Sequence, residues 1–348
     1  MKTRRTVTAT LIAAAAALAL TLSGCVAGED SSADAAKADS ASGSTLTIDF
    51  ATYNPLSLVI KQNGWLEKAL KKQNVTVKWV QSAGSNKAND LLRTGSADIA
   101  STAGSAALLA RANGSPIKTI DIYSQPEWSA IVVGPKSHIT SVAQLKGKQI
   151  AATKGTDPYF FLLQSLDAAG LKPTDVTIQN LQHADGWTAL QNGSVDAWSG
   201  LDPIMANAQQ AGAKLIYRNV DFNTYGFLNA TESFLKKEPK VAQTVVDTYE
   251  YARAWAQQHP DETTKILSDV AGISVPVAKT VITERTNLGV SPIPGQAQLK
   301  VLKKVGPVFV STGDVKSQDD IDAALKSLLQ PSFAKKADPK AIASAIGQ

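Results

Sequence analysis

Leu92-Arg93-Thr94-Gly95-Ser96-Ala97-Asp98 occurs twice in this chain, since Leu190-Gln191-Asn192-Gly193-Ser194-Val195-Asp196 repeats its pattern 98 positions later. A strand-like stretch is repeated in the same way: Val75-Thr76-Val77-Lys78-Trp79-Val80-Gln81 is echoed by Val176-Thr177-Ile178-Gln179-Asn180-Leu181-Gln182. The offset of about 100 residues is longer than the roughly 20–50 residues of a solenoid unit. The pattern therefore predicts two similar α/β lobes with a cleft between them, and a ligand site is expected in that cleft.

The N-terminus has the pattern of an export signal. A cationic start precedes an apolar run over 11–22, which is too short to span a bilayer. The run ends in Leu22-Ser23-Gly24-Cys25, which resembles the lipobox of bacterial lipoproteins, where the chain is cut before a cysteine that carries a diacylglyceryl group. We predict that residues 1–24 are a lipoprotein signal peptide and that Cys25 is lipidated. The alternative is an ordinary secretory signal with an incidental cysteine.

Charge and composition narrow the classes of partner. The whole chain carries a net charge of +5, and removal of the signal peptide with its three cationic residues leaves +2. There is no basic stripe of the kind that binds nucleic acid, so we expect no nucleic-acid partner. Cys25 is the only cysteine, so the sequence predicts no internal disulfide.

Residues 25–44 are rich in Ala, Ser, Asp and Gly and have no bulky side chain after Val26. Such a segment cannot bury enough apolar surface to offset the entropy of ordering, so we predict a flexible tether. No later segment has the length and apolar character of a membrane span. We therefore expect a monomer that is held at the cell membrane by its lipid and faces the extracytoplasmic side.

Predicted strands and helices alternate over most of the chain, which favours open and mainly parallel sheets. The fold class that follows is α/β, with two Rossmann-like lobes. We predict that lobe 1 consists of 45–131 plus 223–348, and that lobe 2 is an insertion, 132–222, joined to it by a hinge of two strands. The region after Ser233 contains no third copy of the repeat and is expected to pack on lobe 1. Its predicted helices span 240–258, 260–271, 275–285 and 297–305.

Five loop-to-helix junctions follow predicted strands, and ligands bind at such strand ends in open α/β sheets. The first turn of each helix has N–H groups without intrahelical partners, and these groups favour an anion by about 0.3–1 kcal/mol per exposed helix end. Several helix ends that face one cleft could hold a sulfonate, a nitrate or a carboxylate; ordinary helix capping is the alternative. The candidate ligand-binding residues at these junctions are Tyr53, Asn54, Ser82, Gly84, Ser101, Thr102, Ala103, Gly104, Gly155, Thr156, Asp157 and Asp202.

Asp157 and Asp202 each have two possible roles. A carboxylate at the start of a helix takes up the N–H groups that an anionic ligand would use, so each could be a simple cap. One of them could instead face an ammonium or hydroxyl group of a zwitterionic or polar ligand. The sequence leaves both roles open.

Aromatic side chains lie near the same junctions and could form a wall against the organic part of a ligand. Core packing is the alternative for each of them, and we expect Trp65, Trp79 and Trp255 in the core. The aromatic candidates for the ligand site are Tyr53, Trp128, Tyr159, Trp198 and Tyr225.

The chain contains no recognisable catalytic constellation. The three histidines, His138, His183 and His259, are scattered and are expected at the surface. There is no His-Glu-x-x-His pattern, no cysteine pair with zinc spacing and no Gly-x-Ser-x-Gly turn. Glu284-Arg285 is interpreted as a surface ion pair or as a contact between lobes. We therefore predict no catalytic residue, no metal and no cofactor.

Five motifs carry a family resemblance: Gly-Ser-Ala-Asp-Ile-Ala-Ser-Thr-Ala-Gly (95–104), Leu-Lys-Gly-Lys-Gln-Ile-Ala (145–151), Thr-Lys-Gly-Thr (153–156), Ala-Gly-Leu-Lys-Pro-Thr-Asp-Val (169–176) and Asn-Gly-Ser-Val-Asp-Ala-Trp (192–198). Together they resemble the aliphatic sulfonate, taurine and nitrate binding proteins of ABC importers, over about 45–315. The resemblance implies a type II periplasmic-binding-protein fold, with two lobes that close around one ligand. It places the pocket at Asn54, 82–84, 101–104, 155–157, Trp198 and Asp202.

The resemblance and the residues together predict an extracytoplasmic solute-binding lipoprotein. It would capture a small anionic or zwitterionic solute, such as a sulfonate or taurine, and deliver it to the permease of an ABC importer. An enzyme on the same fold, related to the synthases of thiamine-pyrimidine precursors, is one alternative, although such enzymes need a reactive histidine or a cysteine-rich metal patch. A sensor lipoprotein without transport is the other alternative.

Overall fold

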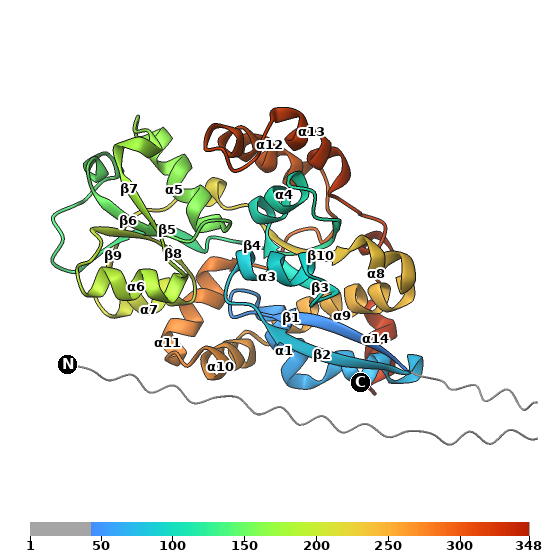
Figure 1. Cartoon of the computed structure of the whole chain (residues 1–348). Coiled ribbons are helices and arrows are strands. Elements are labelled where there is room, and N and C mark those ends of the chain that lie inside the picture. The colour runs from blue at the N-terminus through green and yellow to red at the C-terminus, as the bar shows by residue number, and fades with distance from the viewer. Residues whose placement is uncertain (1–42, 348) are drawn as a thin grey trace, which may run out of the picture. The chain divides into compact units, whose positions relative to one another are not determined.

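Two β-sheets organise the residues that the computed structural model describes, which are 43–347. The predicted signal peptide, Cys25 and nearly all of the predicted tether lie outside these residues. We use "lobe 1" for the part built around the six-stranded sheet and "lobe 2" for the part built around the five-stranded sheet (Figure 1). Within 43–347, no helix has the length and apolar character needed to cross a membrane.

The strands of lobe 1 are β1 (Ser44–Phe50), β2 (Val75–Gln81), β3 (Ile99–Ala103), β4 (Ile117–Pro126), β10 (Gly226–Thr231) and β11 (Thr286–Asn287). Their order in the sheet is β11-β4-β10-β3-β1-β2. β1 is parallel to β2 and β3, whereas β10 is antiparallel to its neighbours β3 and β4. The chain therefore returns from lobe 2 into the middle of the first sheet.

The strands of lobe 2 are β5 (Ser129–Val133), β6 (Gln149–Ala152), β7 (Thr177–Asn180), β8 (Ala197–Leu201) and β9 (Lys214–Tyr217). Their order is β7-β6-β8-β5-β9, with β6 parallel to β7 and β8 and with β5 antiparallel to β8 and β9. Each sheet thus contains parallel strands from one copy of the βα repeat. Beside them lies one antiparallel strand, β10 in lobe 1 and β5 in lobe 2, that adjoins a crossing between the lobes.

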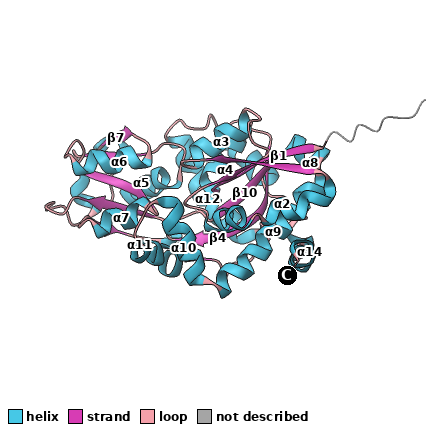
Figure 2. Ribbon diagram, turned by 90° about the horizontal axis from the view of Figure 1, so that it is seen from below, coloured by secondary structure: helices cyan, strands magenta, loops and turns pink. Residues whose placement is uncertain are grey.

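Helices cover the sheets on both faces, as Figures 1 and 2 show. In lobe 2, α5 packs on one face of the sheet, and α6 and α7 pack on the other. In lobe 1, α1, α2, α9 and α14 lie on one side, and α4, α12 and α13 lie on the other. The helices are α1 (Pro55–Asn63), α2 (Trp65–Leu70), α3 (Ser85–Arg93), α4 (Gly104–Ala112), α5 (Asp157–Ala168), α6 (His183–Gln191), α7 (Ile204–Gln210), α8 (Glu232–Lys237), α9 (Pro239–Gln258), α10 (Pro260–Ala271), α11 (Val275–Lys279), α12 (Gln296–Ser311), α13 (Gln318–Ser327) and α14 (Pro339–Ile346).

The chain crosses between the sheets twice. The first crossing, 127–128, joins β4 to β5, and the second crossing, 218–225, joins β9 to β10. β4 pairs with β10 in lobe 1, and β5 pairs with β9 in lobe 2, both in antiparallel fashion. The two crossings therefore lie beside each other at the hinge. The lobe limits inferred from the sequence, 131/132 and 222/223, stay predictions.

The repeated motif has the same structure in both lobes. Its glycine adopts a positive φ in each copy, +70° and +77°, which glycine alone accepts without steric penalty. The aspartate that ends the motif binds the neighbouring strand: the Thr47 N–H donates to Asp98 Oδ2 at 2.8 Å, and the Gln149 N–H donates to Asp196 Oδ2 at 2.9 Å. Both aspartate N–H groups donate back to the carbonyl oxygens of Thr47 and Gln149. The repeat thus fixes the start of a central strand in each sheet.

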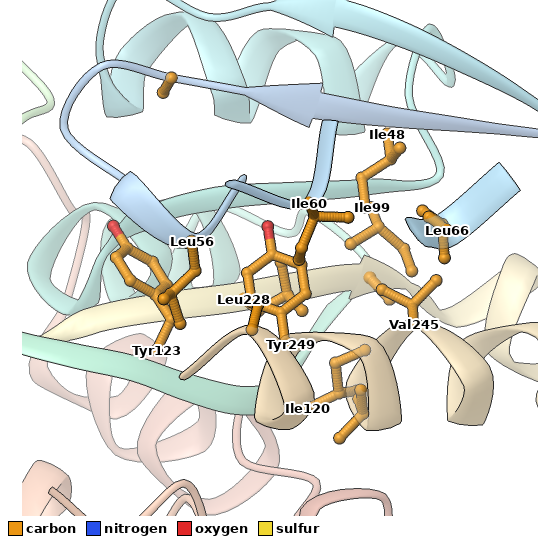
Figure 3. Packing of buried hydrophobic residues seen from close by; sticks show 14 of the residues in the cluster. Ile48, Leu56, Ile60, Leu66, Ile99, Ile120, Tyr123, Leu228, Val245 and Tyr249 are labelled. Atoms are coloured by element: carbon orange, nitrogen blue, oxygen red, sulfur yellow. The ribbon is translucent and has the colours of Figure 1, made fainter. Parts of the chain in front are cut away.

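The core of lobe 1 fills the space between its sheet and the helices α1, α2 and α9. Figure 3 shows how aliphatic side chains of the strands, among them Ile48, Ile99 and Leu228, meet those of the helices. Trp65 belongs to this core, as predicted, whereas Trp79 and Trp255 are only partly buried and pack against its edge. The strands and helices that position the interlobe surface are therefore held by apolar packing, and this core extends to Tyr53 and Trp128.

The C-terminal region has more helix than the sequence suggests. The prediction that a helix ends near residue 305 is wrong, because α12 continues through Gly306 and Pro307 to Ser311. A Cβ at Gly306 would lie 2.5 Å from Cγ2 of Ile321 on α13, so this glycine permits close helix packing. α13 and α14 were not predicted at all.

Gly104 offers a test of the packing at the start of α4. A Cβ there would lie 2.3 Å from the Thr224 carbonyl oxygen and 2.9 Å from the Phe227 ring. Gly104→Ala should lower the free energy of unfolding by about 1–3 kcal/mol, because an overpacked site forces the backbone to shift. Urea denaturation measures the change. Gly134→Ala is the control, since no atom lies within 4 Å of its added carbon; equal losses in both variants would contradict the packing argument.

Candidate functional site

The two lobes meet along a surface that contains most of the predicted ligand residues. Lobe 1 contributes the segments that follow β1, β2 and β3, and lobe 2 contributes those that follow β6, β7 and β8. We use "seam" for the residues of this surface: 49–54, 82–86, 101–105, 126–128, 153–157, 181–183, 201–202, 224 and 285. The strand ends of both sheets therefore face each other, as the repeat predicts.

Tyr53 and Trp128 lie at the centre of the seam. They are 7 % and 3 % exposed, and their ring centroids are 6.0 Å apart with an interplanar angle of 87°, which is an edge-to-face contact. Tyr53 Oη donates to the Ser101 carbonyl oxygen at 3.0 Å and lies 3.0 Å from Ser82 Oγ. Trp128 Nε1 donates to Asp157 Oδ2 at 2.8 Å. The aromatic pair therefore connects polar groups of both lobes.

A buried carboxylate that is not among the predicted residues organises Ser82 and Ser101. Asp49 Oδ2 accepts from Ser82 Oγ at 2.6 Å, and Asp49 Oδ1 accepts from the Ser101 N–H at 2.8 Å. Burial raises the pKa of Asp49 to about 7, although its serine donors oppose the shift. The two predicted serines thus use their hydroxyl groups within lobe 1, and Asp49 sets their positions.

Asp157, the first residue of α5, binds both crossings and lobe 1 at once. Its carboxylate accepts from Ser105 Oγ at 2.6 Å, from Trp128 Nε1 at 2.8 Å, and from the N–H and Oγ1 of Thr224 at 2.8 and 2.6 Å. Burial raises the pKa of Asp157, and these four donors oppose the shift. Asp157 does not cap its own helix, so the capping alternative does not describe it. Instead, it joins the lobes where the chain crosses between them.

Asp202 makes a second connection between the lobes. Asp202 Oδ1 accepts from the Ala206 N–H at 2.9 Å, which caps α7, and its carboxylate also accepts from Arg285 Nη1 at 3.1 and 3.2 Å. Arg285 lies in a π-helical turn at 280–285, is 4 % exposed, and also donates to Gln209. Burial raises the pKa of Asp202 to about 6, and Arg285 opposes the shift. Asp202 therefore combines the capping role with a charged contact across the seam.

A small cavity adjoins this ion pair. It is lined by Tyr53, Trp128, Asp202 and Arg285, with Pro126, Val281 and Thr286. Its volume of about 10 Å³ is enough for one water molecule. Arg285 Nε is buried and has no hydrogen-bond partner among the described residues. Three predicted ligand residues thus surround one space together with a cation that has a donor to spare.

Gly84 faces the other lobe at a different point of the seam. A Cβ at Gly84 would lie 2.9 Å from Nε2 of His183, the first residue of α6. Gly155, which has a φ of +76°, approaches Asn86 from the opposite side, with 3.5 Å between the ideal Cβ of Gly155 and Cβ of Asn86. Small residues therefore let the lobes come into contact, as the sequence suggests for these junctions.

Several predicted residues use their polar groups inside their own lobe or at the hinge. Asn54 Oδ1 accepts from the Ser57 N–H and caps α1, and Thr156 Oγ1 donates to the carbonyl oxygen of Thr153. Thr102 Oγ1 accepts from Asn229 within the first sheet. The Ala103 N–H donates to Ser85 Oγ, and the Gly104 N–H donates to the carbonyl oxygen of Tyr225. The start of α4 is therefore occupied by the second crossing.

The structure does not bring the remaining aromatic candidates to the Tyr53–Trp128 pair. Trp198 is fully buried in the core of lobe 2, where its ring lies 6.2 Å from that of Trp187. Tyr159 packs against Phe160 on α5, with ring centroids 5.2 Å apart. Tyr225 lies in the second crossing and is partly buried. Core packing, the alternative stated above, describes Tyr159 and Trp198.

The prediction that all three histidines lie at the surface is wrong for His183, which is 2 % exposed. A pattern in the sequence points to this position: the strand repeat that relates Val75 to Val176 also relates Ser82 to His183. His183 therefore occupies in lobe 2 the position that a predicted ligand residue occupies in lobe 1. For Glu284-Arg285, the lobe-contact interpretation is confirmed for Arg285, and the surface-pair interpretation is wrong.

Two α/β sheets joined by two crossings, with polar groups of both sheets facing one seam, define the type II periplasmic-binding-protein fold. The predicted fold class is confirmed by solved structures that share it. The chain belongs to the NMT1/THI5-like family, whose sequence model matches residues 57–263.

Relatives of known name agree with the resemblance seen in the motifs. A protein of Escherichia coli (strain K12) named for binding aliphatic sulfonates is 29% identical over 239 residues, which are 68% of this chain and 74% of that protein. A protein of Bacillus subtilis (strain 168) with the same name is 29% identical over 65% of this chain and 69% of its own length.

Solved structures extend the comparison. The crystal structure of the periplasmic aliphatic sulphonate binding protein from Escherichia coli has a TM-score of 0.70 at 27% identity, covering 84% of this chain and 94% of that one. The alkanesulfonate-binding protein from Xanthomonas axonopodis pv. citri, solved bound to MOPS, has a TM-score of 0.74 at 24% identity, covering 82% and 98%. At 24% identity, the similarity to the protein from Xanthomonas axonopodis pv. citri shows a shared fold and nothing more.

Asp157→Asn tests the connection between the lobes. The amide of asparagine would place its own N–H groups against two of the four donors, and we expect the free energy of unfolding to fall by about 2–4 kcal/mol. Chemical denaturation at neutral pH measures the loss. Asp167→Asn changes an exposed carboxylate on the same helix and should be nearly neutral. A similar loss in the two variants would show that Asp157 has no special role.

Asp49 should make stability depend on pH. Because its pKa is raised, the native state holds the proton more tightly than the unfolded chain does. Its contribution to stability is therefore present below its unfolded pKa, and it is lost as the pH rises from about 4 to about 7. In Asp49→Asn the part of this dependence that comes from Asp49 should disappear, while Asp157 and Asp202, whose pKa values are also raised, keep their own parts. Asp90→Asn, at an exposed position on α3, should retain the whole profile. Urea denaturation across this range gives the profiles, and parallel curves for wild type and Asp49→Asn would refute the assignment.

Proposed function

We propose that this protein binds a small anionic or zwitterionic solute between its two lobes and delivers it to the permease of an ABC importer. The family, the relatives named for binding aliphatic sulfonates and the fold support a solute-binding role. The observation that carries the proposal is the seam itself, where buried polar and charged groups of both lobes face each other around Tyr53 and Trp128. Such groups are costly to bury unless each has a partner, and a solute can supply the partners that some of them lack.

Arg285 and Asp202 are the proposed charged contacts of the solute. Arg285 has a donor without a partner in the described structure, and it lies against a carboxylate and two aromatic rings. A sulfonate or carboxylate group fits the guanidinium, an ammonium group fits Asp202, and Tyr53 and Trp128 would cover the organic part. The cavity holds only about one water molecule, so the lobes must separate to admit a solute.

Six other predicted ligand residues have three different roles within this proposal. Ser82, Ser101 and Gly84 lie in the seam and are proposed to line the path of the solute. Asp157 is proposed as a positioning residue, because its acceptor capacity is already used by four donors. Trp198 and Tyr159 are proposed to act only through the packing of lobe 2.

The cellular setting is part of the proposal. The lipobox-like sequence that ends at Cys25 supports a lipid anchor, with 26–44 as the tether and the lobes on the extracytoplasmic side of the membrane. We propose that the protein acts as a monomer and that it meets its permease through the membrane-anchored form. Mass spectrometry of the mature N-terminus would show the lipid.

Binding is favoured over catalysis because the curated relatives are named for binding. The fold alone does not decide between these roles, since a desulfurization enzyme shares it with a TM-score of 0.59 at 16% identity. Among residues 43–347 there is no group of three or more His, Cys, Asp or Glu side chains that could hold a metal ion. The cysteine-rich metal patch of the enzyme alternative is therefore not found in that part of the chain.

Calorimetric titration of the full chain with ethanesulfonate, taurine and nitrate tests the proposal. We expect at least one of them to bind. We expect Arg285→Met to weaken that binding by roughly tenfold or more, because the anion loses the guanidinium and the Asp202 carboxylate loses its charged partner. Arg93→Met removes an exposed arginine of lobe 1 and should leave the affinity unchanged. Circular dichroism would verify that each variant is folded.

The outcomes separate the parts of the proposal. If the wild-type protein binds none of these anions, the proposed solute class is wrong. If Arg285→Met binds as tightly as wild type, the solute site lies elsewhere in the seam and the Asp202–Arg285 pair only joins the lobes.

A further inference from the structure

His183 is held in one tautomer. Its Nδ1 lies 3.2 Å from Thr153 Oγ1, and that hydroxyl donates its single proton to the carbonyl oxygen of Leu181 at 2.6 Å. Thr153 Oγ1 must therefore accept from His183, which places the ring proton on Nδ1. The other ring nitrogen, Nε2, is a bare acceptor when the ring is neutral.

Lobe 1 covers this bare nitrogen. His183 Nε2 is buried and has no hydrogen-bond partner within 43–347, and it points at Gly84, where an added Cβ would lie only 2.9 Å away. Asn86 Oδ1 lies 2.9 Å from the same point and is also buried without a partner. His183 belongs to lobe 2 and both of these neighbours belong to lobe 1, so the ring is buried by the contact between lobes.

We infer that closure of the lobes releases a proton from His183, because lobe 1 buries Nε2 without giving it a hydrogen-bond partner that would hold the second ring proton. The inference rests on the opening and closing that the proposed function requires. It makes His183 a pH sensor for closure: in the open state the ring meets water and can be protonated, and in the closed state Nε2 faces the Gly84 backbone with no acceptor in hydrogen-bond contact.

No charge near His183 offsets this effect. The charged residues nearest to it along the packed elements are Asp185 on α6, Lys154 after β6 and Lys87 on α3, and all three are exposed. Burial alone lowers the pKa of His183, to about 4. An exposed histidine has a pKa of about 6.5. The ring is thus neutral in the closed state over the whole range in which it would titrate in the open state.

The direction of the pH effect follows from these two values. The closed-to-open ratio has its full value above about pH 6.5, and it falls as the pH falls toward about 4. Below about pH 4 the ring is protonated in both states, so the ratio changes no further. Within that window the closed-to-open ratio falls about tenfold per pH unit, because closure releases one proton. A protein that faces the cell exterior would therefore hold its solute less tightly in acid.

A disulfide between the lobes measures closure without any ligand. Gly155→Cys and Asn86→Cys place two Cβ atoms about 3.5 Å apart in the closed state, which is within the range of a disulfide. Cys25→Ser removes the only competing thiol. In the full chain with these three changes, the equilibrium fraction of disulfide in a glutathione redox buffer reports the closed state.

His183→Asn in the same background is the matched variant, because the asparagine amide can still donate to Thr153 but cannot be protonated. Thiol chemistry and the strain of a cysteine at Gly155 are the same in both proteins and cancel in the ratio of their disulfide equilibrium constants. We take the ratio as the disulfide equilibrium constant of the protein that retains His183 divided by that of the His183→Asn variant. As the pH falls from about 7.5 to about 5.5, we expect this ratio to fall by about tenfold. His138→Asn, at an exposed position, should leave the pH dependence of the constant unchanged.

A ratio that is flat or rises in acid would overturn the inference. If the His183→Asn variant does not fold, carbon-13 NMR of the His183 ring in the oxidised protein provides the answer: His183 should titrate well below the value of about 6.5 for a free histidine, and titration near that value would overturn the inference. Neither result depends on solute binding. Calorimetry can therefore find no binding of the three anions while the ratio falls, or find binding while the ratio stays flat. The two experiments thus distinguish failure of the proposed function from failure of this inference.

Discussion

The carboxylate of Asp157 is the interaction on which the arrangement of the lobes depends. It takes donors from α4 of lobe 1 and from both crossings, and it contributes no cap to its own helix. A buried carboxylate is stable only when hydrogen bonds replace its water, so these four donors must stay near it for the lobes to meet as they do. The aromatic pair, the buried ion pair and the covered histidine all lie along the contact that Asp157 holds in place.

Much of this fold can be derived from the sequence, because the repeat carries local information twice. The glycine of the motif that ends in Asp98 and Asp196 turns the chain without any distant partner, although the strand N–H groups that the two aspartates accept from lie 51 and 47 residues away. Alternation and helix-start signals likewise depend on neighbours along the chain. The two-lobe class, the junctions that face the seam and the positions of Gly84 and Asp157 follow from such local signals.

The missed residues depend on contacts between distant parts of the chain. Asp49 alternates with apolar residues along β1 and so looks solvent-facing, but helices and the seam enclose both faces of that strand. His183 looks like a surface residue until lobe 1 covers it, and Arg285 looks exposed until Asp202 of the other lobe pairs with it. Periodicity reports the two faces of one element, and it contains no information about which other element will cover them.

The unequal lengths of the two crossings restrict how one sheet can travel relative to the other. Two residues link β4 to β5, and they span at most about 7 Å when fully extended, whereas the return path of eight residues has slack. Sliding of the sheets past each other is therefore blocked, while rotation about Glu127 and Trp128 is allowed. Trp128 lies at that pivot with its ring against Tyr53, so a rotation of lobe 2 displaces this aromatic contact least and displaces the parts of lobe 2 far from the crossings most.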